Sequence, residues 1–585
     1  MIEIFLISII IVSTTISTGI IANQYFFKFN IYKNFSELGL LGIVVLSILS
    51  FLVHFFTPLN DIISNFIYIF PLSLVLTQKF NRKKILEFSK YCLIFSLFIV
   101  VYLSYSNFYR PDAGWYHLPF SRLISDYKII GGAASLHPMF GTSAILQYLS
   151  TVFHNSILGV NGILFVNPTI LILFLGFFFN AMMKESQPTL KFLSLLILFS
   201  IFIEMNRNSE LGNDAPGYLF YFYLIYAFIR SKLVTGFKKD SFKFLSLISV
   251  FCFFIKSLYL LALAIPLFIF IKDQLYLKKT NYFYTASFVL VAWLIKNLII
   301  TGCLIYPLSF TCSDKLSWYS SESKFEISAK NTSQFSELHS KGWPDFREDK
   351  QYYLNYDDQL SDKNNFLKRF NWLSEYLNQG RAHNITKKID FFIPVIVIFL
   401  FLSFLTLKKD TRKNFVKKNR DLKRINYNFL LYSSLLFTTI VLVKLPDARY
   451  FFGYLFLNIF LIIIYFFDIK LLFLKNKISY VTNVFLIVLF SVFILKNSQK
   501  IFLNSESTTP LPKLYSEKII FDFRTKKITN GNVLNIYYTD SVYSKFASNK
   551  LCTYHKSPCI QNRSILDQFN VKNVNGYLIL KLIKN

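Results

Sequence analysis

Charged side chains are scarce in this chain. Asp, Glu, Lys and Arg make up 16% of its 585 residues, whereas hydrophobic residues make up 54% and gather in long blocks. A bilayer core about 30 Å thick requires about twenty apolar residues per helix, so repeated blocks of that length indicate repeated membrane crossings. The short-period alternation that marks a membrane β-barrel is absent, and unpaired backbone groups are costly in lipid. We therefore expect these blocks to be helices.

Acidic residues are the scarcer of the two charged classes. The chain has 33 Asp and Glu against 63 Lys and Arg, which gives a formal net charge of +30. A nucleic-acid partner would require the basic residues to gather on one soluble face. Here they lie mainly in the short connectors between apolar blocks, the distribution that the positive-inside rule describes. We interpret the charge as a signal of membrane topology and predict no nucleic-acid partner.

Cysteine is also rare, and no Cys-x-x-Cys motif occurs. Four of the six cysteines form two close pairs in polar stretches, Cys303 with Cys312 and Cys552 with Cys559. Cys92 and Cys252 lie inside apolar blocks, where they are expected to be packing residues. Paired thiols outside the membrane suit an oxidising compartment, so both pairs are disulfide candidates. Zinc is the alternative, with His555 as the only histidine near either pair.

The apolar blocks predict an all-α polytopic membrane protein of about fourteen transmembrane helices, with a small α/β appendage at the C-terminus. The helices are expected near residues 2–22, 38–57, 62–78, 88–106, 157–182, 191–205, 216–230, 243–255, 257–271, 282–301, 389–407, 427–443, 450–468 and 479–495. The resulting regions are N-terminal helices (1–106), an outward loop with an amphipathic helix (107–156), central helices (157–301), an outward loop region (302–388), C-terminal helices (389–495) and a soluble tail (496–585).

Loop charges predict the orientation. The strongly basic connectors all fall on one side of a fourteen-helix arrangement, which should be the cytoplasm: 79–90, 230–243, 272–281 and 408–424. The long polar segments and both cysteine pairs then face outward, to the periplasm or the cell exterior. The first block carries Glu3 and no basic residue, so it does not resemble a signal peptide.

One apolar stretch contains a lysine near its middle. A lysine at the bilayer centre costs about 2.5–3.5 kcal/mol on insertion scales. We therefore predict that residues 243–271 form two short helices that meet at Lys256, near the outer surface.

The first outward loop carries an acid, a base and an aromatic pair. It reads Arg110-Pro-Asp112-Ala-Gly-Trp115-Tyr116-His117-Leu-Pro119. A partly desolvated carboxylate beside His or Arg is placed to take a proton from a hydroxyl, which favours a functional site at Asp112. The alternative is a solvated loop whose aromatic residues are interfacial anchors. The loop continues through His137 to an amphipathic stretch that suits a helix lying flat on the outer surface.

Three further outward junctions carry ionisable or polar residues. The second junction holds Asn206, Arg207, Glu210, Asn213 and Asp214, the third Lys296 and Asn297, and the fourth Arg449 and Tyr450. Arginine suits bidentate recognition of phosphate, whereas a lysine near a helix end more often snorkels to the surface. We hypothesise that these junctions converge on one cavity.

Two motifs carry a family resemblance. Asp-x-x-x-Tyr-His-Leu-Pro, at Asp112 to Pro119, resembles the GT-C glycosyltransferases, including the family 39-like enzymes. Trp-x-x-Lys-Asn-x-x-x-Thr-Gly-x-x-x-Tyr-Pro, at Trp293 to Pro307, is similar to a junction of the same group, which usually has Arg at the position of Lys296. The Arg449-Tyr450 pair is similar as well, and the Cys552 and Cys559 pair resembles the ending of one uncharacterised branch.

The resemblance implies a glycosyltransferase of the inner membrane that takes sugar from a polyprenyl-phosphate donor to a saccharide, lipid or protein acceptor. Asp112 would be the base, with Asp214 as a second candidate, and His117 would orient Asp112 or contact the phosphate. The predicted substrate contacts are Arg110, Tyr116, His137, Lys256, Lys296, Asn297, Arg449 and Tyr450.

The chain departs from the family in two respects. Many relatives carry a metal-binding Asp pair, but no Asp-x-Asp follows Asp112, so we assign no metal ligand and leave Mg²⁺ or Mn²⁺ as an open alternative. The motif loop follows the fourth predicted helix, whereas in typical members it follows the first. A transporter or flippase for lipid-linked saccharides is the alternative function, as is a polymerase or ligase.

Overall fold

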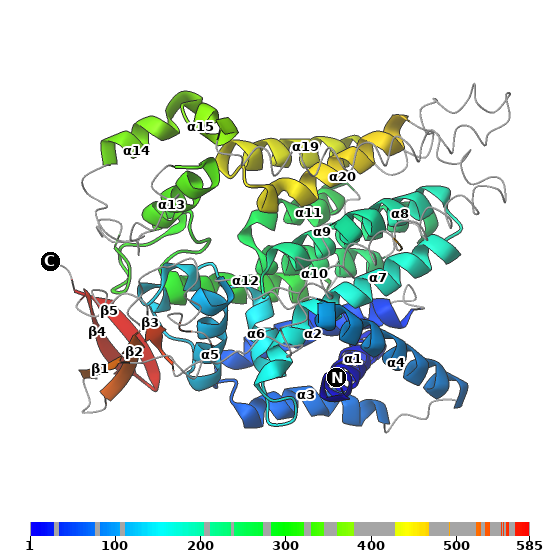
Figure 1. The fold of residues 1–585 in the computed structure, drawn as a ribbon, viewed down its shortest axis with the longest axis horizontal. Coiled ribbons are helices and arrows are strands. Elements are labelled where there is room, and N and C mark those ends of the chain that lie inside the picture. Colours follow the sequence, from blue (N-terminus) through cyan, green and yellow to red (C-terminus); the bar gives the residue numbers. More distant parts are fainter. Residues whose placement is uncertain are drawn as a thin grey trace.

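The computed structural model describes residues 2–27, 34–76, 82–105, 112–203, 211–235, 239–272, 282–320, 329–343, 360–378, 427–466, 491, 522–527, 533–538, 552, 554, 557–560 and 568–583. Most of them belong to helices packed side by side, with a small β-structure from the end of the chain at one edge (Figure 1). The predicted combination of a helical protein with a small C-terminal appendage is therefore confirmed. The described residues of the tail form strands.

The N-terminal helices pack closely against one another. They are α1 (Ile2–Ala22), α2 (Phe35–His54), α3 (Asp61–Leu76) and α4 (Arg82–Tyr105). Where α1 crosses α2, a Cβ on Gly19 would lie 1.8 Å from the Leu38 carbonyl oxygen, and one on Gly42 would lie 1.7 Å from that of Thr15. Only glycine permits this approach of two backbones, as at helix contacts in membrane proteins.

The central helices form the largest part of the bundle. They are α5 (Leu118–Asp126), α6 (Ile145–Phe153), α7 (Val166–Lys184), α8 (Pro188–Ile203), α9 (Asp214–Arg230), α10 (Lys239–Ile255), α11 (Ala264–Lys272) and α12 (Tyr282–Thr301). Three shorter helices follow outside this bundle, α13 (Ala329–Lys341), α14 (Leu360–Leu367) and α15 (Leu373–Asn378). The last two long helices are α19 (Tyr427–Lys444) and α20 (Ala448–Phe466), which lie beside each other (Figure 1).

The predicted number of membrane spans is wrong for the described residues. Five helical segments are long and apolar enough to cross a membrane, namely Ile2–Phe27, Phe35–His54, Ile85–Leu103, Asn161–Lys184 and Tyr284–Thr301. Six other apolar helices, such as Ser241–Ile255, have only 10–17 residues within the described part of the chain. These apolar helices suggest a membrane-embedded protein. The predicted helices at 389–407 and 479–495 lie outside the described residues, apart from residue 491.

The amphipathic stretch does not lie flat on a surface. It forms α6, in which every residue from Ile145 to Phe153 is buried. Helices α2, α3 and α5 pack against it. Most of its polar side chains have partners within the protein, as when the hydroxyl of Thr151 donates to the Gln147 carbonyl at 2.8 Å.

The tail forms two small sheets. Strands β1 (Asp522–Lys527) and β2 (Val533–Tyr538) are antiparallel, and β3 (Cys559–Ile560) pairs in parallel with β2. Strands β4 (Phe569–Val574) and β5 (Tyr577–Leu582) form a hairpin. Its turn places Asn575 and Gly576 at positive φ, as a two-residue hairpin turn requires.

The hairpin docks on the segment that follows α5. The amide of Gly131 donates to the Leu578 carbonyl at 2.8 Å, and the amide of Leu580 donates back to Gly131 at the same distance. Through these two hydrogen bonds the tail is attached to the segment that follows the Asp112 motif.

Both predicted cysteine pairs, Cys303–Cys312 and Cys552–Cys559, are disulfide-bonded in the structure.

Candidate functional site

Asp112 lies at the start of the helical segment that precedes α5. It precedes a short π-helical turn, Ala113–His117, which leads directly into α5. Such turns are rare and are frequent at functional sites. The Asp112 side chain is 41% exposed, so solvent reaches its carboxylate.

Asp214 and Lys256 form an ion pair between two neighbouring helices. Asp214 is the first residue of α9, where a carboxylate is favoured by the helix dipole. Lys256 has an extended backbone, with φ −158° and ψ 129°, between the end of α10 and a 3₁₀ segment at Ser257–Leu263. The predicted interruption at Lys256 is therefore confirmed. At this interruption the ammonium group of Lys256 lies against the carboxylate of Asp214.

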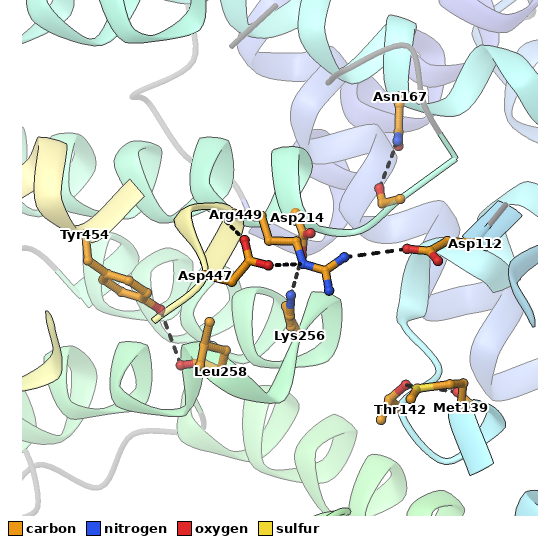
Figure 2. Close-up of polar contacts among 11 residues, drawn as sticks. Asp112, Met139, Thr142, Asn167, Asp214, Lys256, Leu258, Asp447, Arg449 and Tyr454 are labelled. Carbon is orange, nitrogen blue, oxygen red and sulfur yellow. Dashed lines mark hydrogen bonds and ion pairs between the residues drawn. The ribbon is translucent and has the colours of Figure 1, made fainter. Parts of the chain in front are cut away.

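Arg449 brings a third segment to the same place. It lies in the first turn of α20, where the Asp447 carboxylate accepts its backbone amide at 3.0 Å and lies 3.4 Å from its Nε. The other side of the guanidinium faces the first loop, with Nη1 3.6 Å from Oδ2 of Asp112. Figure 2 shows Arg449 between Asp112 and Asp447, with Asp214 and Lys256 beside it.

Tyr450 packs against both cations. The Nζ atom of Lys256 lies 4.0 Å from the centre of its ring, and the Cζ atom of Arg449 lies 4.7 Å from it. At such distances the ring face attracts a cation. We call the six residues that meet here the site cluster: Asp112, Asp214, Lys256, Asp447, Arg449 and Tyr450.

The site cluster is rich in charge and only partly buried. It holds three carboxylates and two cations, whose side chains are 22–41% exposed. Burial opposes the charged form of Arg449, but Tyr450 and the three carboxylates outweigh it and raise the arginine's pKa well above its ordinary value. The guanidinium therefore stays charged, while its contacts to Asp447 and Asp112, at 3.4 and 3.6 Å, are long for charge-assisted hydrogen bonds.

His117 does not orient Asp112. Its side chain is buried, and the side-chain amide of Gln147 donates to its Nδ1 at 3.1 Å. Burial lowers its pKa to about 4, although Asp112 and Asp214 act in the opposite direction. No hydrogen bond joins His117 to Asp112 among the described residues. The ring lies against α6, where Gln147 offers a hydrogen-bond partner, so the orienting role is not seen, while the predicted contact with the phosphate stays a prediction.

His137 is likewise buried and neutral. Its Nδ1 accepts the backbone amide of Met139 at 3.2 Å, and burial lowers its pKa to about 4. The ring stacks on Tyr116 with 6.2 Å between ring centres and meets Trp115 edge-on at 5.8 Å. These aromatic contacts support the loop that carries Asp112.

Lys296 does not join the site cluster. Its side chain is completely buried, where Nζ donates to Ser143 Oγ at 2.8 Å and to Asn297 Oδ1 at 3.1 Å and lies 3.9 Å from the Trp293 ring centre. The Asn297 amide in turn donates to the Leu304 carbonyl at 3.0 Å. Within the described part of the chain these partners tie α12 to two loops, so Lys296, predicted as a substrate contact, lies apart from the site cluster.

Several residues predicted from the sequence cannot be placed in the structure. Arg110, Asn206, Arg207 and Glu210 lie outside the described residues. Asp447, by contrast, belongs to the site cluster and was not selected from the sequence. The sequence does carry a sign of Asp447, because aspartate is a common N-cap residue and this one directly precedes α20.

The carboxylates of the site cluster already have cationic partners. No group of three His, Cys, Asp or Glu side chains suited to a metal ion occurs among the residues that the structure describes. Asp112 and Asp447 face Arg449, and Asp214 faces Lys256. The donor set does not fit a divalent metal, and no step is assigned to one.

Fold and site together define a largely helical, membrane-embedded class of protein in which four separate segments bring acids and bases to one place. The chain belongs to the family described as Domain of unknown function (DUF8201), whose model matches residues 1–456. That range contains the whole site cluster but not the tail. No curated protein and no solved structure matches the chain.

Proposed function

We propose that the protein is a GT-C-like glycosyltransferase. It transfers a sugar from a polyprenyl-phosphate donor to a cell-envelope acceptor, on the outer face of the inner membrane. The observation that carries this proposal is the approach of Asp112 to Arg449, from segments far apart in the chain. A base that stands beside a phosphate-binding cation is what transfer from a lipid phosphate requires.

Asp112 is the base in this proposal. It removes the proton of an acceptor hydroxyl while the hydroxyl oxygen forms a bond to the anomeric carbon of the donor sugar. The bond between that carbon and the phosphate oxygen breaks, and its electron pair leaves with the phosphate. The 41% exposure of the Asp112 side chain supports access by an acceptor.

Arg449 and Lys256 stabilise the departing phosphate. Each is already paired with a carboxylate, so the phosphate must take over part of those contacts. A guanidinium suits this exchange because its planar fork of donors can bind two phosphate oxygens at once. Asp214 and Asp447 hold the two cations in position when no donor is bound.

The test compares two aspartates that lie close together in sequence. Asp112→Asn removes the base with little change in shape, and Asp126→Asn is the matched control because Asp126, near the end of α5, pairs with Arg122 away from the site cluster. With polyprenyl-phosphate hexoses and pentoses as donors, we expect Asp112→Asn to lose about 10²–10⁴ in transfer rate while Asp126→Asn keeps it. Well-folded Asp112→Asn protein with full transfer activity contradicts the assignment.

A transporter or flippase of lipid-linked saccharides is the second candidate, alongside a polymerase or ligase. It is favoured by ion pairs at both ends of α9, Asp214 with Lys256 and Arg230 with Glu37, which would suit two gates. In proteoliposomes that contain a fluorescent lipid-linked saccharide, a transporter moves the lipid across the bilayer without forming a new glycosidic bond. A transferase yields the glycosylated acceptor and leaves the unreacted lipid in its original leaflet.

A further inference from the structure

We propose that Tyr376 is a positioning residue for Arg449, which it holds through the turn between α19 and α20. This inference rests on the proposed function, because it assigns Arg449 to the phosphate. Tyr376 lies in α15, remote in sequence from Arg449, and its side chain is buried. Its hydroxyl donates to the carbonyl oxygen of Pro446 at 2.6 Å.

The turn that receives this hydrogen bond is short. Helix α19 ends at Lys444 and α20 begins at Ala448, so Pro446 and Asp447 lie between two helices. The Asp447 carboxylate accepts the backbone amide of Arg449 at 3.0 Å and forms an ion pair with its guanidinium, 3.4 Å from Nε. A displacement of Pro446 is therefore passed on to Asp447 and then to the guanidinium.

The hydroxyl of Tyr376 is well placed to fix this turn. A buried tyrosine hydroxyl holds the carbonyl that it meets in place, because leaving that carbonyl without a partner is costly. The Tyr376 ring is in turn packed edge-on against Trp372, with 5.6 Å between ring centres. Its position is thus set before any ligand binds.

A second contact joins the same regions. Glu337 of α13 accepts Lys341 at 2.5 Å and lies 3.5 Å from Lys444, the last residue of α19. The Nζ atom of Lys341 lies 4.8 Å from the ring centre of Trp372. Because the Lys444 side chain is 66% exposed, its ion pair contributes little, and Tyr376 is the main link.

The test is equilibrium binding of polyprenyl monophosphate to the full-length protein in nanodiscs. Tyr376→Phe removes one hydroxyl and leaves every charge of the site cluster, and we expect about 5-fold weaker binding together with a small loss of thermal stability from the unpaired Pro446 carbonyl. Tyr432→Phe is the matched control, since Tyr432 lies on α19 and is exposed, and it should bind as the natural protein does. Arg449→Gln should weaken binding about 50-fold or more.

The outcomes separate this inference from the proposed function. If Arg449→Gln loses binding and Tyr376→Phe retains it, the positioning role is overturned while the phosphate site stands. If Arg449→Gln binds normally, the proposed phosphate site fails and the inference fails with it. Should Tyr376→Phe fold poorly, Trp372→Phe loosens the packing that sets the Tyr376 ring, with about 2-fold weaker binding expected and unchanged affinity counting against the inference.

Discussion

The two ends of α9 carry ion clusters that differ in burial and in hydrogen bonding. At its first residue, Asp214 joins the partly exposed site cluster. At its last residue, Arg230 Nη1 lies 3.1 Å from Glu37, and Arg230 Nε lies 3.2 Å from Glu185. For a helix of 17 residues the two ends are about 25 Å apart. One helix thus connects two charged sites of different character.

The two ion clusters differ because tyrosine hydroxyls donate to the carboxylates near Arg230. We call Glu37, Glu185 and Arg230 the Arg230 cluster. The hydroxyl of Tyr223 donates to Glu37 at 2.9 Å, and Tyr226 donates to Glu185 at 3.3 Å. Glu37 is only 3% exposed, whereas Asp112 is 41% exposed. The Arg230 cluster therefore ties helices together, while the site cluster has room to exchange partners with a ligand.

The largest predicted effect concerns the Arg230 cluster. Glu37→Gln leaves a partly buried guanidinium with one fewer anionic partner, and we expect the free energy of unfolding to fall by about 3–5 kcal/mol. Glu87→Gln on the exposed face of α4 is the control and should change it by less than about 0.5 kcal/mol. Thermal unfolding in detergent measures both. Equal stability of Glu37→Gln and the natural protein would remove the contrast between the two clusters.

A smaller effect concerns how the stability of the fold depends on pH through two histidines near the site cluster. His117 and His137 are buried with a pKa of about 4, below the ordinary value of about 6.5. The folded state thus binds fewer protons than the unfolded state, so stability is fully present above about pH 6.5 and is lost as the pH falls toward 4. Each histidine should remove about 2 kcal/mol between pH 7 and pH 5.

Glutamine substitutions separate the two contributions. His117→Gln and His137→Gln should each flatten this pH dependence by about 2 kcal/mol, whatever they do to stability at pH 7. Unfolding at both pH values in the same detergent provides the comparison. An unaltered pH dependence in both variants would show that the two rings are solvated rather than buried.

The smallest predicted effect tests whether the site cluster exchanges partners. Asp214→Asn removes the anion that neutralises Lys256, so the ammonium becomes available to a phosphate. We expect polyprenyl monophosphate to bind about 3-fold more tightly to this variant. Glu185→Gln, the corresponding change at the other end of α9, should leave this affinity unchanged. Weaker binding to Asp214→Asn would indicate that Asp214 itself contacts the ligand.

Local features of the fold could be predicted from the sequence. The bounds of α1 agree with the apolar block at 2–22, and Lys256 marks the interruption after α10 because a buried lysine within one long helix is costly. The hypothesis that outward junctions converge anticipated Asp112 beside Arg449. The apolar block predicted α1, and the charged residues next to apolar blocks predicted the interruption at Lys256 and the approach of Asp112 to Arg449.

Features that depend on tertiary contacts could not be predicted. The ring of His117 finds Gln147 on α6, and Lys296 finds Ser143, through packing that sequence spacing does not show. Helix α6 is amphipathic in sequence but is covered on both faces by neighbouring helices. The number of spans was overestimated for the same reason, because short apolar helices inside a bundle resemble spans in composition.

The most direct test of the central claim is a structure of the full-length protein with a polyprenyl-phosphate sugar bound. We expect the phosphate to lie within hydrogen-bonding distance of Arg449 and Lys256, with the anomeric carbon next to Asp112. A phosphate that binds at the Arg230 cluster, or anywhere away from Arg449, would contradict it.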